Sequence, residues 1–323
     1  MTATILELRN VSKHFCLTGI RNIGKTVHAM DDVDLTLGMG ESLALVGESG
    51  SGKNTTASVI AGMYEKTSGD ILLDGRPVRA FKNRAESLAY KKRVQMIFQD
   101  PFASLNPTHT IRAIMERPFL IHGLAAGKAA LEAKLSESLE QVGLSPAAEY
   151  LRRFPHELSG GQRQRVNIAR TFAVDPEVIL ADEPTSMLDV SIRIGIMNMM
   201  LDLKERKNVS YLYITHDLAG ARYMSTRIAV MYAGMIMEIG PTEEVIANAL
   251  HPYVKLLKAS APAPQQGKRN DEVKAKGEIP SLVSPPMGCR FHTRCPYALD
   301  LCSKEVPAMR DVGNGHLVRC VLV

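Results

Sequence analysis

The sequence contains no tryptophan, and aromatic residues make up only 5% of its 323 positions. Its 39 basic and 34 acidic residues are spread along the chain, whereas a nucleic-acid-binding surface normally clusters lysine and arginine, often among aromatics. Long hydrophobic runs are also lacking, because runs such as 178–181 and 228–233 fall far short of the ~18–20 residues that span a bilayer. The first residues, MTATILELRN, show no signal-peptide pattern. We therefore expect a chain that is made in the cytosol, stays on that side of the membrane and binds no nucleic acid.

The overall composition is that of a folded protein. Hydrophobic residues make up 45% and charged residues 23%, which excludes a disordered chain, a collagen-like fibre and a disulfide-dense miniprotein. The length allows about two domains at roughly 150 residues each.

The first part of the chain reads as strands and the next part as helices. Alternating apolar and polar residues predict half-buried antiparallel strands at 5–15 and 27–37. A continuous apolar run predicts a buried strand at 42–46, followed by a helix over 55–64. Residues of about 110–175 are rich in helix formers.

An α/β pattern then resumes. Buried strands are predicted at 178–182 and 209–215, with a helix at 191–207 between them. The stretch 259–288 has few large apolar residues and many prolines, glycines and charges, which indicates a linker.

A glycine-rich loop follows the strand predicted at 42–46. It consists of Gly47, Glu48, Ser49, Gly50, Ser51, Gly52 and Lys53. Such a loop between a strand and a helix lets backbone N–H groups surround phosphates, while the lysine meets the β- and γ-oxygens and the helix start adds its positive dipole end. The pattern predicts a nucleotide-phosphate site.

The residue after the lysine departs from this pattern. Phosphate loops normally carry Ser or Thr there, and its hydroxyl binds Mg²⁺. Here the residue is Asn54, which is bulkier, and Thr55 lies about 100° further round the helix and does not simply replace it. The departure brings magnesium binding, and therefore hydrolysis, into question.

Other polar residues follow apolar segments. Ser159 and Gln162 in LSGGQ (158–162) have the spacing of a capping box, and Gly160 and Gly161 expose the amides of a helix start. Asp182 and Glu183 end the strand predicted at 178–182 and offer one carboxylate for a metal and one for a water.

In order and spacing, these segments resemble the ATP-binding cassette (ABC) family over about residues 5–245. The resemblance adds Gln99, Asp189 and His216 to the motifs already described. It implies a cassette with a RecA-like α/β core, an antiparallel β subdomain and a helical subdomain at about 100–175. In the family, ATP lies between the phosphate loop of one cassette and the signature of a second.

The resemblance also implies roles for individual residues. Glu183 would polarise the attacking water, and His216 would contact that water and the γ-phosphate. Asp182 and Gln99 would complete the Mg²⁺ shell. Residues 159–162 would contact ATP held by the partner cassette, and Asp189 would couple the two sites. Phe15 is placed like the aromatic residue that stacks on adenine.

Further segments resemble the ATP-binding subunits of oligopeptide and dipeptide importers. They are HPYVKLL (251–257), the tail 288–320, QDPFASLNPTHTI (99–111) and EPTSMLDVSIR (183–193). This implies a nucleotide-binding domain at 1–250 and a C-terminal extension at 251–323. It also implies a peripheral subunit at the cytoplasmic face of the membrane that powers peptide import. Its partners would be a second, different ATPase subunit, two permease subunits and an external solute-binding protein.

Four of the five cysteines crowd the tail, at Cys289, Cys295, Cys302 and Cys320. Such a cluster in a cytosolic protein indicates metal rather than disulfides, and four thiolates suit either an iron–sulfur cluster or zinc. The spacing C-x5-C-x6-C-x17-C matches neither a common zinc finger nor a ferredoxin run. The importer resemblance favours a [4Fe–4S] cluster, with zinc second and free buried thiols as the remaining reading.

Two other functions stay open at this point. Asn54 favours a subunit that binds nucleotide but hydrolyses it poorly and supports the other subunit's site, whereas Glu183, His216 and the signature oppose that reading. The second alternative is a soluble cassette ATPase without a permease. It lacks support, because neither a second cassette nor a long coiled-coil insertion is seen.

Overall fold

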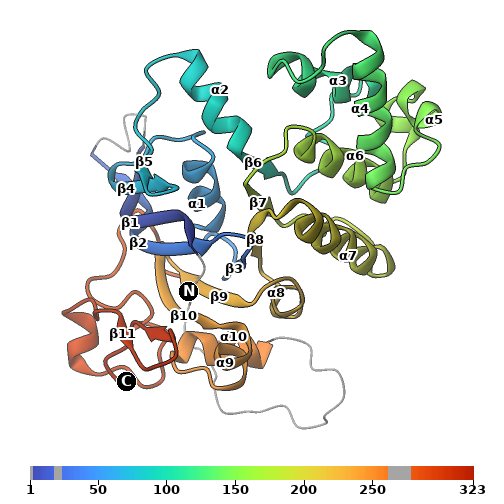
Figure 1. Cartoon of the computed structure of the whole chain (residues 1–323). Coiled ribbons are helices and arrows are strands. Elements are labelled where there is room, and N and C mark those ends of the chain that lie inside the picture. The colour runs from blue at the N-terminus through green and yellow to red at the C-terminus, as the bar shows by residue number, and fades with distance from the viewer. Residues whose placement is uncertain (1–2, 18–23, 261–277) are drawn as a thin grey trace. The chain divides into compact units, whose positions relative to one another are not determined.

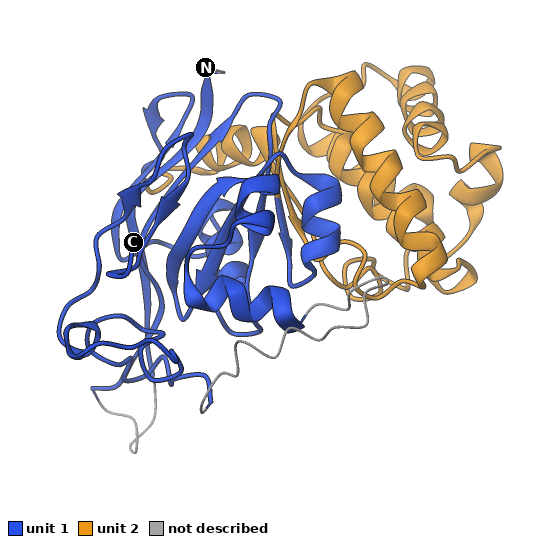
Figure 2. Cartoon of the chain, turned by 90° about the horizontal axis from the view of Figure 1, so that it is seen from below, with its two compact units in different colours: residues 1–79, 213–323 blue, residues 80–212 orange. Residues whose placement is uncertain are grey.

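The computed structural model describes residues 3–17, 24–260 and 278–323 (Figure 1). The chain forms two compact units, which Figure 2 colours separately. Unit 1 combines residues 1–79 with 213–323, and unit 2 contains residues 80–212. In the part of the chain that is described, no helix has both the length and the apolar character needed to cross a membrane.

The first sheet of unit 1 is antiparallel, with strand order β2-β1-β4-β5. Its strands are β1 (Thr4–Cys16), β2 (Thr26–Gly38), β4 (Ser68–Leu73) and β5 (Arg76–Pro77). In β2, Val33, Leu35 and Leu37 are buried, while Asp34 and Thr36 between them are exposed. The alternation that predicted this strand therefore reflects one face on the core and one in solvent, and β1 pairs with β2 as expected.

The second sheet of unit 1 is mixed, and five of its strands run in the order β11-β12-β10-β9-β3. They are β3 (Ser42–Val46), β9 (Arg227–Tyr232), β10 (Met235–Pro241), β11 (Arg310–Asp311) and β12 (Leu317–Val318). All five residues of β3 are buried, as the continuous apolar run predicts, and β3 pairs in parallel with β9. Because β12 pairs with β10, the end of the chain joins the same sheet that carries the phosphate loop.

Short helices complete unit 1. They are α1 (Lys53–Ile60), α8 (Leu218–Met224), α9 (Thr242–Ala247), α10 (Pro252–Ser260) and a 3₁₀ turn at Asp300–Ser303. The helix expected over 55–64 is wrong at both ends. It starts at Lys53 because Gly52, with φ 107°, is its N-cap, and it ends at Ile60, shortly before Gly62 in a left-handed conformation.

Unit 2 is mainly helical. Its helices are α2 (Arg84–Arg93), α3 (Ile111–Ile121), α4 (Lys128–Gln141), α5 (Ala147–Arg152), the 3₁₀ turn Pro155–Glu157, α6 (Gly160–Phe172) and α7 (Val190–Lys207). Strands β6 (Val94–Ile97) and β7 (Val178–Asp182) pair in parallel. The helices predicted within 110–175 and at 191–207, and the strand at 178–182, are therefore confirmed.

Two further segments complete the comparison with the sequence. Strand β8 (Ser210–Thr215), predicted at 209–215, contains the boundary between the units. Of the linker predicted at 259–288, residues 261–277 lie outside the described residues. Its two ends are the last residues of α10 and, from residue 278, a segment without helix or strand.

Three aromatic rings join separate parts of unit 1. Tyr232 of β9, Tyr253 of α10 and Phe291 of the C-terminal segment are buried, with ring centroids 4.5 to 5.4 Å apart. Tilted and edge-on pairs of this kind add about 0.5–1.5 kcal/mol each beyond the area they bury. The C-terminal segment is therefore packed into the core around β9 and α10.

Candidate functional site

The phosphate loop connects β3 to α1 and requires glycine at two positions. A Cβ atom at Gly47 would lie 2.1 Å from the Met231 carbonyl oxygen. A Cβ atom at Gly52, whose φ is 107°, would lie 2.4 Å from the Ala29 carbonyl oxygen. Neither approach is possible for a side chain, so the loop is packed by its backbone against neighbouring backbone.

The Lys53 ammonium lies inside the curve of this loop. It donates hydrogen bonds to the carbonyl oxygens of Gly47, at 2.7 Å, and Glu48, at 2.9 Å, and the residue is 3% exposed. The cation and the first backbone amides of α1 therefore belong to one concave surface, which suits an anionic phosphate chain.

Hydroxyl groups near the start of α1 do not occupy the expected magnesium position. Asn54 is the second residue of the helix and is exposed, and Thr55 is half-buried. Thr56, which the sequence patterns did not single out, is fully buried and donates its hydroxyl to the Gly52 carbonyl oxygen at 3.0 Å. The side chain next to Lys53 thus presents an amide, not a hydroxyl.

Phe15 lies near the end of β1 and is half-buried. Its ring meets Tyr64 edge-on, with centroids 5.2 Å apart, and the Lys13 ammonium lies 4.7 Å from its centroid. A ring that is only partly covered retains surface for stacking, so the expectation that Phe15 contacts adenine stays a prediction.

An ion-pair network lies next to Phe15 in the chain. Asp31 bonds to His14 and to the Arg290 guanidinium, and its Oδ2 lies 3.1 Å from His28 Nδ1. Burial alone would raise the pKa of the Asp31 carboxyl. The hydrogen bonds and charges of His14 and Arg290 outweigh that effect and hold the pKa below its ordinary value. Donor atoms of the two histidines and Asp31 lie within 4.8 Å of one another. Because Arg290 already neutralises the carboxylate, the group is better explained as an ion pair than as a metal site.

The predicted signature begins a helix with its own cap. Ser159 is the N-cap of α6, and its hydroxyl accepts a hydrogen bond from the Gln162 backbone at 3.3 Å. In return the Gln162 side chain accepts from the Ser159 backbone at 3.0 Å. The capping box predicted from the spacing is therefore confirmed, and it leaves the amide groups of Gly160 and Gly161 in the first turn.

A pair of carboxylates ends β7. Asp182 is 5% exposed, and Glu183 follows it with φ 43°, in the left-handed region that non-glycine residues rarely adopt. The Gln99 amide donates to Glu183 Oε2 at 3.1 Å, so two residues 84 positions apart meet within unit 2. Strained backbone of this kind is common where a side chain is aimed for function.

The two units divide the predicted residues between them. Unit 1 carries Phe15, the phosphate loop and His216, an exposed residue just after β8. Unit 2 carries Gln99, the signature at 158–162, the carboxylates and Asp189, the exposed N-cap of α7.

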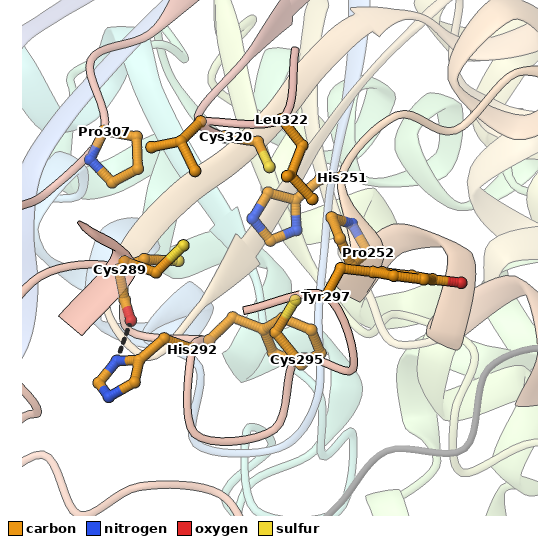
Figure 3. Close-up of a pocket in the computed structure, with 12 residues that line it drawn as sticks. His251, Pro252, Cys289, His292, Cys295, Tyr297, Pro307, Cys320 and Leu322 are labelled. Carbon is orange, nitrogen blue, oxygen red and sulfur yellow. Dashed lines mark hydrogen bonds between the residues drawn. The ribbon is translucent and has the colours of Figure 1, made fainter. Parts of the chain in front are cut away.

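The four tail cysteines line one cavity, shown in Figure 3. Its lining also includes His251, Phe291 and His292, and it is a narrow space that is partly open to solvent. His292 Nδ1 lies 2.8 Å from the Cys289 carbonyl oxygen, which makes this nitrogen a donor (Figure 3). All four thiols are free.

Electrostatics show that the cysteine side chains share one environment. Burial, together with the smaller effect of charge on Cys302, Cys320 and Cys295, raises the pKa of Cys289 to about 11. Burial also raises the pKa of Cys295 and of Cys320. Cys302 and Cys320 are buried and Cys289 and Cys295 are partly buried, and a thiolate in such surroundings is stabilised when positive charge is placed beside it.

Two residues that contact the phosphate loop were missed by the sequence patterns. Arg294 donates to both carboxylate oxygens of Glu48, at 2.8 and 3.3 Å, and this ion pair raises its pKa. The Tyr253 hydroxyl accepts from the Glu48 backbone at 2.9 Å. These residues lie 246 and 205 positions from Glu48, so no local pattern pairs them with the loop, although both lie in the segments that resemble peptide importers.

Known proteins match nearly the whole chain. A family model for ABC transporters matches residues 30–186, and one for the oligopeptide/dipeptide transporter C-terminal region matches 237–302. The oligopeptide transport ATP-binding protein AppF of Bacillus subtilis is 43% identical over 99% of this chain and 97% of its own length. A putative peptide import ATP-binding protein of Brucella ovis is 41% identical over 99% of both chains.

A solved structure agrees with these matches. A dimeric post-hydrolysis structure of the ATP-binding cassette MJ0796, bound to ADP and Pi, is 28% identical and has a TM-score of 0.65. The match covers 74% of the present chain and 99% of the MJ0796 chain. The mixed sheet, the phosphate loop and the capped signature helix are thus those of an ATP-binding cassette, as the sequence predicted. The chain belongs to the ABC transporter family, among the ATP-binding proteins of oligopeptide and dipeptide transporters.

Proposed function

We propose that this chain binds and hydrolyses ATP to power the import of peptides through a membrane permease. The proposal rests on one observation: the same chain contains the motifs of an ATP-binding cassette in their usual order and a C-terminal region of the oligopeptide/dipeptide transporter type. Its full-length relatives are named for oligopeptide transport and peptide import, which supports peptides as the transported class.

Residues 47–55, with Lys53 at the centre, would hold the phosphates of ATP, and Phe15 would stack on its adenine. Glu183 would accept a proton from the attacking water, while the Gln99 amide, 3.1 Å from Oε2, holds that carboxylate in place. His216 would contact the γ-phosphate. Asp182 and Gln99 would hold Mg²⁺, which neutralises phosphate charge when bound.

The signature would act on ATP held by another subunit. Ser159, Gly160, Gly161 and Gln162 form an anion-binding helix start in α6, and Asp189 would connect the two sites across the interface. We infer a second, different ATPase subunit, two permease subunits and an external solute-binding protein, with this chain peripheral at the cytoplasmic face of the membrane. The helical segment 100–175 would dock on the permease.

Capture of the tagged full chain from detergent-solubilised membranes tests the assembly. We expect two integral membrane proteins and a second cassette ATPase to co-purify in near-equal amounts, and an untagged chain to retain none of them. Recovery of the chain without integral membrane proteins would favour a soluble ATPase instead.

The cysteine cavity has the donor set of an iron–sulfur cluster. Four thiols from one segment line it, and soft thiolates select iron–sulfur clusters or zinc. A tetrahedral zinc site with Zn–S bonds of about 2.3 Å holds its sulfurs within roughly 4 Å of one another. In the described residues, the donor atoms that lie within 4.8 Å of one another belong to His14, His28 and Asp31. We infer a [4Fe–4S] cluster rather than zinc for the four cysteines, in a structural role.

Metal analysis distinguishes the two centres. Chain purified without oxygen is expected to contain about four iron atoms and four labile sulfides per molecule, because a cubane cluster takes one thiolate from each cysteine. Cys302→Ser should lower both values, whereas Cys16→Ser, at an exposed cysteine outside the cavity, should leave them unchanged. One zinc and no iron would contradict the cluster proposal.

A further inference from the structure

The cysteine-bearing segment also contacts the phosphate loop. Two buried arginines, Arg290 and Arg294, lie between Cys289 and Cys295, with side chains 7% and 10% exposed. Arg294 donates to both carboxylate oxygens of Glu48 inside the loop. Residues 289–295, which begin and end with cysteines of the cavity, therefore place the Arg294 guanidinium against the phosphate loop.

The second arginine reaches the loop by a different route. Arg290 bonds to the Ala233 carbonyl oxygen in the turn between β9 and β10. The next residue of that turn, Gly234, donates its backbone N–H to the Ser51 carbonyl oxygen at 2.8 Å. The segment therefore contacts the loop directly at Glu48 and supports it indirectly at Ser51, through the turn between β9 and β10.

The contact with Arg294 matters because of the charge on Glu48. Glu48 places a carboxylate in a loop whose ligand is a polyanion, and an uncompensated negative charge there would repel the phosphates. The Arg294 guanidinium neutralises it with two hydrogen bonds, and the Tyr253 hydroxyl accepts from the Glu48 backbone at 2.9 Å. Phe291, fully buried against Tyr232 and Tyr253, fixes the segment that presents Arg294.

We propose that Arg294 is a positioning residue for nucleotide binding that compensates Glu48, and that filling of the cysteine site tightens nucleotide binding by ordering residues 289–295. The first half stands on the ion pair alone. The second half rests on the proposed metal centre. Loss of that centre, by oxidation or by lack of metal, would then lower the affinity of the transporter subunit for nucleotide.

Calorimetric titration of the full chain with Mg²⁺-ADP isolates the phosphate loop, because ADP is not turned over. Arg294→Gln should weaken ADP binding about tenfold, within the usual range of coupling between sites. Lys304→Gln, at an exposed position of the same extension, should leave binding unchanged. The double variant Glu48→Gln with Arg294→Gln should restore affinity to within about threefold of the wild type, because it removes the unpaired carboxylate.

A merely structural role for Arg294 predicts a different result. The double variant would then bind ADP as weakly as Arg294→Gln, and that outcome, or an Arg294→Gln variant no weaker than Lys304→Gln, would overturn the proposal. Glu48→Gln alone covers the case in which Arg294→Gln does not fold. It should bind ADP at least as tightly as the wild type, and clearly weaker binding would count against charge compensation.

The link to the cysteines has its own test. Cys295→Ser should weaken ADP binding in the wild-type background and weaken it clearly less in the Glu48→Gln background, where only the route through Arg290 is lost. An equal loss in both backgrounds would overturn the coupling. If metal analysis finds no metal in the wild-type chain, the proposed centre fails, while the Glu48 and Arg294 variants still decide the role of the ion pair.

Discussion

Replacing Glu183 with glutamine is expected to reduce ATP hydrolysis by the assembled transporter at least about 100-fold, the lower range for loss of a general base. The side chain keeps its size and its contact with Gln99, but the neutral amide no longer accepts a proton from water. Nucleotide binding should persist, because the residues of the phosphate loop are untouched. Steady-state phosphate release and ADP titration measure the two effects separately.

Glu205→Gln is the matched control. Glu205 is exposed on α7 in the same unit, and its loss should leave hydrolysis unchanged. If Glu183→Gln slows hydrolysis less than about fivefold, the productive water is not activated by this chain, and the subunit chiefly supports its partner's site.

The second large effect is expected at Asn54. Asn54→Ser places a hydroxyl next to Lys53, at the first turn of α1, where a phosphate loop normally binds Mg²⁺. Better-held Mg²⁺ stabilises the charge of the transition state, and we expect hydrolysis to rise by at least about tenfold. The measurement is the Mg²⁺-dependent ATPase rate of the assembled complex as a function of magnesium concentration.

Thr55→Ser serves as the comparison, because it changes a neighbouring hydroxyl residue without altering position 54. It should not raise the rate. Equal rates for the wild type and Asn54→Ser would show that the amide is tolerated or that this site does not limit turnover. The hypothesis of a weakly hydrolysing partner subunit would then lose its main support.

Local chemistry made much of this molecule predictable. The capping box of Ser159 and Gln162 depends on residues three apart, and the glycines of the phosphate loop on a single turn, so spacing alone locates both. The alternation of β2 and the continuous apolar run of β3 likewise follow from which faces are buried.

Contacts between distant segments were not predictable. The Arg294–Glu48 ion pair joins residues 246 positions apart, and the buried pair of His316 Nε2 and Glu238, 2.8 Å apart, joins residues 78 apart. Burial raises the pKa of Glu238, and the His316 bond offsets part of that cost. Both pairs exist because the C-terminal segment folds back on the sheet that carries the phosphate loop, an arrangement that tertiary packing determines.

The most direct test of the central claim is ATP-driven movement of a labelled peptide through the purified complex in proteoliposomes. Peptide-loaded binding protein is placed on one side and Mg²⁺-ATP on the side that exposes this chain. We expect the peptide to accumulate on the ATP side and the accumulation to disappear when this chain carries Glu183→Gln. Accumulation that continues undiminished with Glu183→Gln, or hydrolysis without any peptide movement, would contradict the account.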